Sequence, residues 1–219
     1  MKTQKARVFL VDDHPLVREW LTNMLNQQPD LVVCGEADEV PRAREAIAAL
    51  QPQVAIVDIS LKSGSGLELV KDIDATCPEV AVIVLSMHDE LLYAERAFRA
   101  GARGYVMKRD STKKVVEAIR QVLDGRQYMS ERVAAAIAEK ATGGHEVGAS
   151  PMTLLSDREL EVFEQLGQAK ETREIADSLH VSVKTVQTFC ARIKEKLGLH
   201  TERELLREAM RYREDRPSR

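Results

Sequence analysis

The chain has 219 residues, of which 44% are hydrophobic and 31% are charged, a composition typical of a globular protein with one large or two small domains. Its net charge of −3 excludes a protein that is strongly basic throughout. The longest unbroken apolar runs, 80–85 and 133–138, have six residues each, whereas a membrane-spanning helix needs about 20. Asp12 and Asp13 interrupt the first apolar stretch, so we expect no signal peptide, no membrane partner and a cytoplasmic location.

Short apolar segments rich in β-branched residues alternate with helix-period segments from residue 8 to residue 123. The apolar segments are 8–11, 31–34, 54–57, 80–85 and 104–107. The helix-period segments are 15–27, 41–50, 66–76, 90–100 and 112–123. Continuous apolar character indicates strands buried on both faces, and strict alternation with helices indicates right-handed crossovers. We predict an α/β fold with a doubly wound, five-stranded parallel sheet.

A second, all-helical region is predicted beyond a linker. After a helix at 131–140, the segment 141–151 contains three glycines and one proline, as linkers often do. The helices predicted after it are 157–167, 173–179, 183–197 and 202–212. Ser156 and Glu159 form a capping-box pattern before the first of these, and Gly198 is placed to end the third. These patterns predict a small all-α domain.

Polar residues follow or end four of the predicted strands: Asp12 and Asp13, Asp58, Ser86, and Lys108. The carboxyl ends of parallel strands meet at one edge of a sheet, so these side chains are expected to converge. Each aspartate taken alone is explained as a helix cap or as part of a solvated loop. Four strand ends with related chemistry favour a functional site.

Three carboxylates at one edge raise each other's pKa unless a cation neutralises them. Oxygen ligands favour Mg²⁺, with Asp13 and Asp58 as direct ligands, Asp12 acting through water, and the backbone carbonyl of Ser60 completing the set. Lys108 adds a positive charge that can pair with Asp58 or with a phosphoryl oxygen. This surrounding suits Asp58 to accept a phosphoryl group as a nucleophile.

Cysteine and histidine spacings offer no second site. The three cysteines are Cys34, Cys77 and Cys190, and the five histidines are His14, His88, His145, His180 and His200. The cysteines are odd in number and far apart, and no histidines have the spacing of paired metal ligands. We expect reduced, buried thiols and no histidine ligand for a metal.

The strand-end residues lie in motifs that resemble the receiver domain of bacterial response regulators. The motifs are FLVDDH at 9–14, VDIS at 57–60, VLSM at 84–87 and GYVMK at 104–108, within a similarity that covers about 6–125. The resemblance implies a flavodoxin-like fold and phosphorylation of Asp58 by a partner histidine kinase. It also implies that Asp12, Asp13 and Asp58 bind Mg²⁺.

The same resemblance implies a switch in which the Ser86 hydroxyl turns toward the phosphoryl group and Tyr105 follows into the vacated space. Two plainer interpretations stay open, a helix N-cap for Ser86 and a half-buried aromatic for Tyr105. Ser60 lies two residues after Asp58, where family members tune dephosphorylation.

The segment 183–197 is predicted to be an amphipathic helix. Its apolar stripe is Val183, Val186, Cys190, Ile193 and Leu197, and its opposite face is Lys184, Thr185, Gln187, Thr188, Ala191, Arg192 and Lys194. Four bases and one acid give it a local charge of +3, although 151–219 has 13 basic and 13 acidic residues. With Ser182 as N-cap after a short helix and a tight connection, it has the arrangement of a helix-turn-helix. The plainer interpretation is a helical packing module with a solvated basic face.

This region resembles the LuxR-type helix-turn-helix over about 153–212, through the motifs at 155–162, 174–179, 183–186 and 196–199. Together with a receiver, it is similar to the NarL/FixJ class of response regulators. We expect Lys184, Thr185, Gln187, Thr188, Arg192 and Lys194 to contact double-stranded promoter DNA. Gln187 can read adenine by two hydrogen bonds, whereas the basic residues bind phosphates.

We predict a receiver at 1–128, a helix and flexible linker at 129–152 and a DNA-binding domain at 153–219. Phosphorylation of Asp58 would promote homodimerisation and change promoter occupancy. No enzymatic role is expected beyond slow autophosphorylation from acyl phosphates and autodephosphorylation. Two alternatives remain: an enzyme with an aspartyl-phosphate intermediate, or a protein-interaction regulator with weak or no DNA binding, which Ala191 and Glu202 leave open because they depart from the family's pattern.

Overall fold

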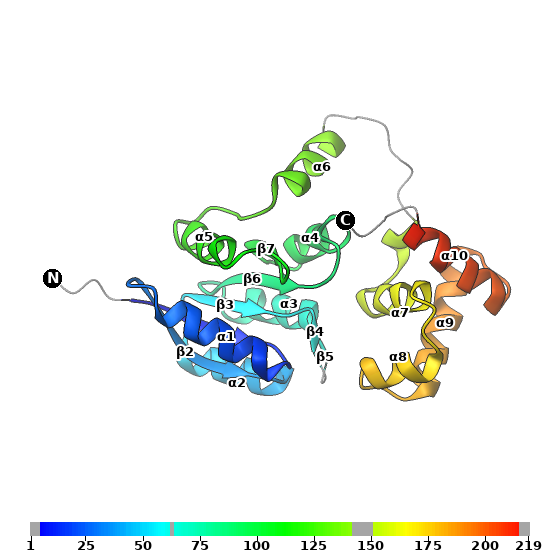
Figure 1. Ribbon diagram of the computed structural model, residues 1–219, viewed down its shortest axis with the longest axis horizontal. Coiled ribbons are helices and arrows are strands. Elements are labelled where there is room, and N and C mark those ends of the chain that lie inside the picture. Colours follow the sequence, from blue (N-terminus) through cyan, green and yellow to red (C-terminus); the bar gives the residue numbers. More distant parts are fainter. Residues whose placement is uncertain (1–4, 62–63, 142–150, 215–219) are drawn as a thin grey trace. The chain divides into compact units, whose positions relative to one another are not determined.

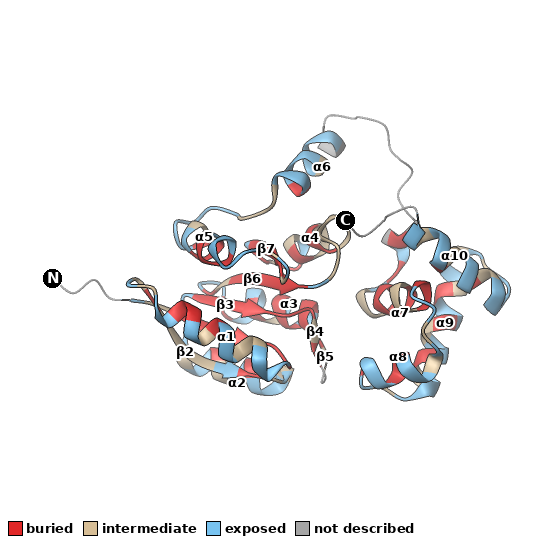
Figure 2. Ribbon diagram, viewed as in Figure 1, coloured by how far each residue is buried: buried red, intermediate tan, exposed pale blue. Residues whose placement is uncertain are grey.

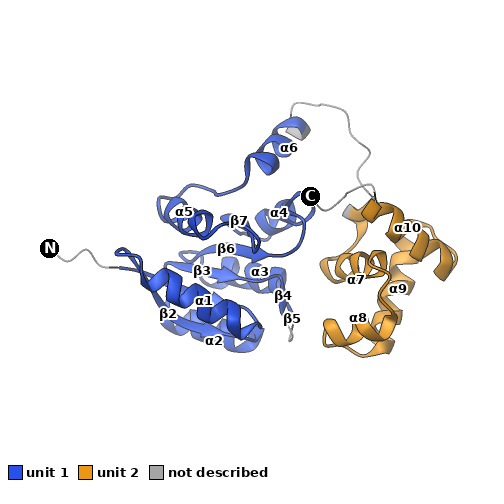
Figure 3. Ribbon diagram, in the orientation of Figure 1, with its two compact units in different colours: residues 1–142 blue, residues 143–219 orange. Residues whose placement is uncertain are grey.

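A computed structural model describes residues 5–61, 64–141 and 151–214. The chain divides into two compact units, 1–142 and 143–219, which Figure 3 draws in different colours. Most of the predicted linker, 142–150, lies outside the described residues. None of the described helices is long and apolar enough to cross a membrane.

The first unit contains a five-stranded parallel sheet with the order β2-β1-β3-β6-β7 (Figure 1). Its strands are β1 (Ala6–Val11), β2 (Leu31–Ala37), β3 (Val54–Val57), β6 (Ala81–Ser86) and β7 (Gly104–Met107). Two short antiparallel strands, β4 (Ser60–Leu61) and β5 (Gly64–Ser65), follow β3. All four residues of β3 and of β7 are buried, as expected for parallel strands covered on both faces. The predicted fold is confirmed.

Helices cover the sheet on both faces (Figure 2). They are α1 (Pro15–Asn26), α2 (Val40–Leu50), α3 (Gly66–Thr76), α4 (Glu90–Arg99) and α5 (Thr112–Leu123), followed by α6 (Glu131–Ala141). One face packs against α1 and α5 through strand residues such as Val8 and Ile56. Side chains alternate along a strand, so Phe9 points to the opposite face, beside Leu50 of α2. On that face α2 contacts α3, and α3 contacts α4.

The strand order places the functional edge between β1 and β3, because the chain leaves these neighbouring strands in opposite directions along the sheet. Asp12 follows β1, Asp58 follows β3, Ser86 ends β6, and Lys108 follows β7. The backbone keeps this edge in register, since the Asp58 amide donates to the Val11 carbonyl oxygen at 2.8 Å. Parallel pairing therefore brings the predicted site residues together.

The second unit is helical. It contains the 3-10 helix η1 (Pro151–Leu154) and the α-helices α7 (Asp157–Gly167), α8 (Thr172–Ser178), α9 (Val183–Leu197) and α10 (Glu202–Glu214). Both hydrogen bonds of the predicted Ser156–Glu159 capping box are present. Burial raises the pKa of Glu159, but hydrogen bonds from Lys196 and Ser156 outweigh it and lower that pKa. The Ser182 side chain caps α9, and Gly198 ends it with a φ of +65°.

Several boundaries and burials differ from the sequence-based expectations. Val183 is 40% exposed rather than part of the buried stripe, because it begins α9 and its side chain leans toward the helix N-terminus. Leu197, at the other end of that stripe, is only half-buried. Cys34 is also half-buried, since it lies in the edge strand β2, which extends to Ala37.

The turn from Asp58 into α3 leaves no room for a side chain at Gly66. A Cβ there would lie 1.9 Å from the Asp58 carbonyl oxygen, whereas a Cβ on Gly64 would first meet Val40 Cγ2 at 3.1 Å. We predict that Gly66→Ala displaces the backbone at Asp58 and lowers the free energy of unfolding by about 2 kcal/mol. Gly64→Ala should change it by less than about 1 kcal/mol. Urea titration followed by the fluorescence of Trp20, the single tryptophan, measures both. Equal losses in the two variants would contradict this account.

Candidate functional site

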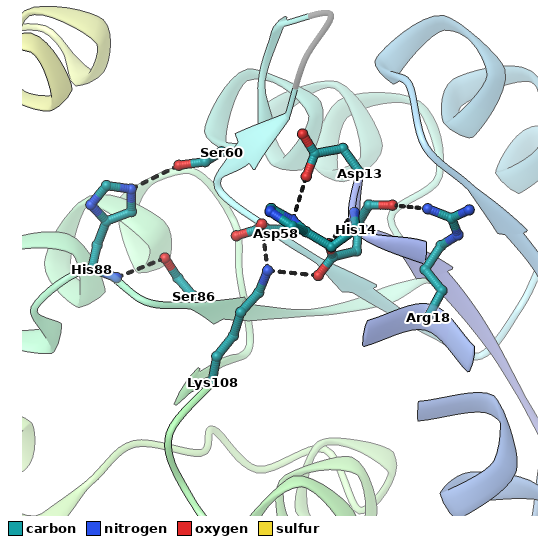
Figure 4. Close-up of polar contacts among 9 residues, drawn as sticks. Asp13, His14, Arg18, Asp58, Ser60, Ser86, His88 and Lys108 are labelled. Carbon is teal, nitrogen blue, oxygen red and sulfur yellow. Dashed lines mark hydrogen bonds and ion pairs between the residues drawn. The ribbon is translucent and has the colours of Figure 1, made fainter. Parts of the chain in front are cut away.

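The three predicted aspartates converge at the carboxyl edge of the sheet. Asp12, Asp13 and Asp58 are all buried. Lys108 lies between two of them, with its Nζ 2.7 Å from Asp12 Oδ2 and 2.6 Å from Asp58 Oδ2. Figure 4 shows this lysine reaching Asp58 from β7. The predicted pairing of Lys108 with Asp58 is present.

One lysine does not neutralise this group fully. The pKa of Asp58 is raised to about 6, and burial is the largest cause. The charge of Asp12 also raises this pKa, whereas the charge of Lys108 and hydrogen bonds from Lys108 and the Ser60 backbone lower it. For Lys108, burial lowers the pKa, but Asp58 and Asp12 outweigh burial and leave it above its ordinary value. The balance leaves excess negative charge in a buried place, which favours a second cation.

The donor set fits a divalent cation. Ligand atoms of Asp12, Asp13, His14 and Asp58 all lie within 4.8 Å of one another. The Oδ1 atom of Asp13 is buried and accepts no hydrogen bond from the described residues. Carboxylate oxygens are the ligands that Mg²⁺ prefers, and an unsatisfied buried carboxylate oxygen is the position where a cation is most stabilising.

His14 is the member of this group that the sequence did not indicate. Its Nδ1 lies 2.6 Å from Asp13 Oδ1 and 3.1 Å from Asp12 Oδ1, and its backbone amide donates to Asp12 Oδ1 at 2.8 Å (Figure 4). We expected no histidine ligand because no two histidines have metal-site spacing. That criterion overlooks a single histidine directly after two aspartates at a strand end.

Ser86 and Tyr105 meet at one residue of the loop between β6 and α4. The Ser86 Oγ accepts a hydrogen bond from the His88 amide at 3.1 Å, and the Tyr105 hydroxyl donates to the His88 carbonyl at 2.9 Å. The N-cap of α4 is Asp89, whose side chain accepts from Leu91, so Ser86 is not that cap. Tyr105 is 2% exposed, so it is more deeply buried than the half-buried alternative. The switch itself stays a prediction.

His88 also connects this loop to the segment that follows Asp58. Its Nε2 lies 2.8 Å from the Ser60 hydroxyl, and its ring lies 4.4 Å from that of Tyr93 in α4. The structure shows this contact of the Ser60 side chain (Figure 4), whereas the metal-binding role predicted for its backbone carbonyl stays a prediction. No sequence pattern indicated this contact, because the two residues are 28 positions apart.

The predicted reading face of α9 is largely accessible. Lys184, Gln187, Thr188 and Arg192 are exposed, and Thr185 and Lys194 are half-buried. Two of the four bases on this helix face acids: Lys194 Nζ lies 3.0 Å from Glu202 Oε1, and Lys196 Nζ lies 2.6 Å from Glu159 Oε2. Lys184 and Arg192 are therefore the bases of α9 best placed to meet phosphates.

An acidic edge on a parallel sheet, joined in one chain to a helix-turn-helix, is the combination expected of a DNA-binding response regulator. Residues 8–120 match the response regulator receiver domain, and residues 153–209 match the bacterial regulatory proteins of the luxR family. The chain belongs to the response regulators of the NarL/FixJ class, which regulate transcription. The predicted family is confirmed.

Curated relatives match over nearly the whole chain. The DNA-binding transcriptional activator DevR/DosR of Mycobacterium tuberculosis is 34% identical over 194 residues, covering 89% of each chain. The response regulator GacA of Pseudomonas aeruginosa is 34% identical over 206 residues, covering 94% of this chain and 96% of GacA. A solved structure of RcsB from Salmonella enterica serovar Typhimurium, bound to the promoter rprA with the phosphomimetic BeF₃⁻, is 25% identical, has a TM-score of 0.62, and covers 93% of this chain and 98% of that one.

The raised pKa of Asp58 predicts how stability changes with pH. An aspartate in an unfolded chain has a pKa of about 3.9, so between about pH 4 and pH 6 the unfolded state ionises first and stability falls as pH rises. Asp58→Asn removes this ionisation and should raise the unfolding free energy at pH 7 by about 2 kcal/mol in the presence of a chelator. The gain should shrink toward pH 4.

Urea titrations at several pH values measure that difference. The matched control is Asp124→Asn, which removes an exposed carboxylate of the same unit and should change stability by less than about 0.5 kcal/mol. A gain from Asp58→Asn that is constant with pH would show that burial does not control this carboxylate.

Proposed function

We propose that a histidine kinase phosphorylates Asp58 and that the phosphoryl group changes dimerisation and promoter binding by the helix-turn-helix. The observation that supports this most strongly is the Asp58 carboxylate itself, buried beside Asp12 and 2.6 Å from Lys108 Nζ. Phosphoryl transfer depends on positioning and charge stabilisation, and these neighbours offer both.

In the proposed transfer, an Asp58 carboxylate oxygen forms a bond to phosphorus as the phosphorus–nitrogen bond of a phosphohistidine breaks. The leaving imidazole keeps the electron pair of that bond. Lys108 donates hydrogen bonds to the phosphoryl oxygens and stabilises their negative charge. Asp12, Asp13, Asp58 and the Ser60 carbonyl would hold Mg²⁺, which supplies further charge neutralisation at the phosphoryl oxygens when bound.

The proposed output begins at Ser86. Its hydroxyl would turn from the His88 amide, where it now accepts, to donate to a phosphoryl oxygen. That change removes one of the contacts that hold His88, which also bonds to Tyr105 and Ser60. A local charge change would thereby alter the loop that leads into α4.

In the helical unit, α9 would enter the major groove of DNA. Gln187 is exposed and can read adenine, and the other predicted contacts are Lys184, Thr185, Thr188, Arg192 and Lys194. The promoter-bound RcsB relative supports DNA binding in the presence of a phosphoryl mimic. A homodimer would place two α9 helices on half-sites about 34 Å apart, one helical turn of DNA.

This proposal keeps the domains as predicted: a receiver at 1–128, a helix and linker at 129–152 and a DNA-binding domain at 153–219. Action on chromosomal promoters requires a cytoplasmic protein. At the described acidic site, the proposed chemistry is phosphoryl gain from acyl phosphates and slow hydrolysis of the aspartyl phosphate.

Phosphate incorporation tests the acceptor directly. Incubated with a labelled acyl phosphate and Mg²⁺, the wild-type chain should incorporate acid-stable, hydroxylamine-labile phosphate, because an aspartyl phosphate is an acyl phosphate. Asp58→Asn should reduce the label to background, while Asp124→Asn should keep it. Label that persists in Asp58→Asn would move the acceptor to another residue.

The ion pair of Lys194 with Glu202 predicts that removing an acidic residue increases the affinity for DNA. On a duplex selected from random sequence, Glu202→Gln should raise affinity about threefold and steepen the salt dependence, because Lys194 is released to meet a phosphate. Lys184→Ala should weaken binding and reduce the slope of log K against log salt by about 1. Fluorescence anisotropy at several salt concentrations measures both.

Glu208→Gln is the matched control for Glu202→Gln. It removes an equal charge from α10, where Glu208 pairs with Arg211 instead of with a residue of α9. An equal gain from both variants would mean that overall charge, and not Lys194, sets the affinity. Failure to select any duplex at low salt would favour the protein-interaction alternative.

A further inference from the structure

The geometry points to His14 as a further protein ligand of the cation that Asp12, Asp13, Asp58 and the Ser60 carbonyl are proposed to hold. This imidazole ligand makes the site select a transition-metal dication such as Mn²⁺. This inference rests on the proposed cation site and names the residue that sets its metal preference. The sequence pattern that defines the site consists of oxygen donors alone, so an imidazole changes its chemistry.

The distances suit one shared ion. In an octahedral site with bonds of roughly 2.1 Å, ligand atoms lie roughly 3 Å apart at right angles and roughly 4.2 Å apart across the ion. The four donors of this group are within 4.8 Å of one another, and His14 Nδ1 already forms a hydrogen bond with Asp12 Oδ1 at 3.1 Å, which a shared ion would replace. Small side-chain movements are enough to place all four around one ion.

A second observation points into the same space. The Oδ1 atom of Asp13 is buried and, among the described residues, no donor meets hydrogen-bond geometry with it. His14 Nδ1 lies 2.6 Å from it, at ion-pair distance. A cation bound by both satisfies the carboxylate oxygen and uses the imidazole nitrogen.

The local backbone keeps His14 available for this role. It is the N-cap residue of α1, yet its side chain makes no capping hydrogen bond to the helix. Its amide donates to Asp12, and Pro15 begins the helix, so the backbone is fixed beside the carboxylates. The side chain is 63% exposed, so the ring can adjust its position without disturbing the core.

An imidazole ligand changes the binding affinities of Mg²⁺ and Mn²⁺ unequally. Mg²⁺ prefers oxygen ligands and keeps several of its waters, so it gains little from a nitrogen donor. First-row transition dications accept imidazole readily. A carboxylate site prefers Mn²⁺ to some degree in any case, so the evidence is the change in that preference when His14 is replaced.

The test compares the full-length wild type with His14→Gln and with His200→Gln, a matched control in the helical unit. Mn²⁺ and Mg²⁺ affinities are measured by calorimetry at about pH 7.5, where a typical imidazole is neutral. Electron spin-echo spectroscopy of bound Mn²⁺ detects a coordinated ¹⁴N directly. We expect His14→Gln to lower Mn²⁺ affinity about tenfold, to change Mg²⁺ affinity less than about twofold, and to lose the nitrogen coupling.

Other outcomes overturn the inference, and they separate it from the proposed function. If His14→Gln keeps both affinities, or keeps a nitrogen coupling that His88→Gln removes, His14 is not the ligand and the acidic site still stands. If the wild type binds neither cation, the proposed cation site fails and this inference fails with it. His200→Gln should match the wild type in every measurement.

Discussion

Three buried carboxylates, compensated by a single lysine, are the constraint on which the receiver unit depends. Two of them share Lys108, and the third, Asp13, has a buried oxygen that accepts no hydrogen bond from the part of the chain that the structure describes. Burial outweighs the lysine at Asp58 and raises its pKa to about 6, so the site carries negative charge at a free-energy cost. The carboxylates stay close together despite this cost because the pairing of the parallel strands fixes the strand ends that carry them. A bound cation would relieve that charge, and the proposed phosphoryl group would redistribute it.

The same edge explains how chemistry at Asp58 can reach the rest of the unit. His88 is the residue on which several contacts meet: Ser86 and Tyr105 bond to its backbone, and Ser60 bonds to its ring. In the proposed switch, a change at Ser86 would reach Tyr105 in β7 and Ser60 after Asp58 through these contacts with His88. Such a contiguous set of contacts is a physical route for coupling when it has two arrangements that phosphorylation can bias.

The sequence predicted the sheet, the helices and the acidic residues because each depends on local patterns. Apolar runs such as 54–57 specify buried strands, and parallel topology then brings Asp12 and Asp58 together. It could not predict the contact of Ser60 with His88 or the approach of His14 to Asp13, since these depend on loop conformations and side-chain directions. The pairing of Lys194 with Glu202 was missed for a similar reason, because it joins two helices across a turn.

The coupling between phosphorylation and DNA binding tests the central claim most directly. The affinity of the full-length chain for a selected duplex is measured with and without beryllium fluoride and Mg²⁺, at one salt concentration, for the wild type and for Asp58→Asn. The account predicts that affinity rises at least about fivefold for the wild type and stays unchanged for Asp58→Asn. A wild-type affinity that does not respond, or an equal response in Asp58→Asn, would contradict it.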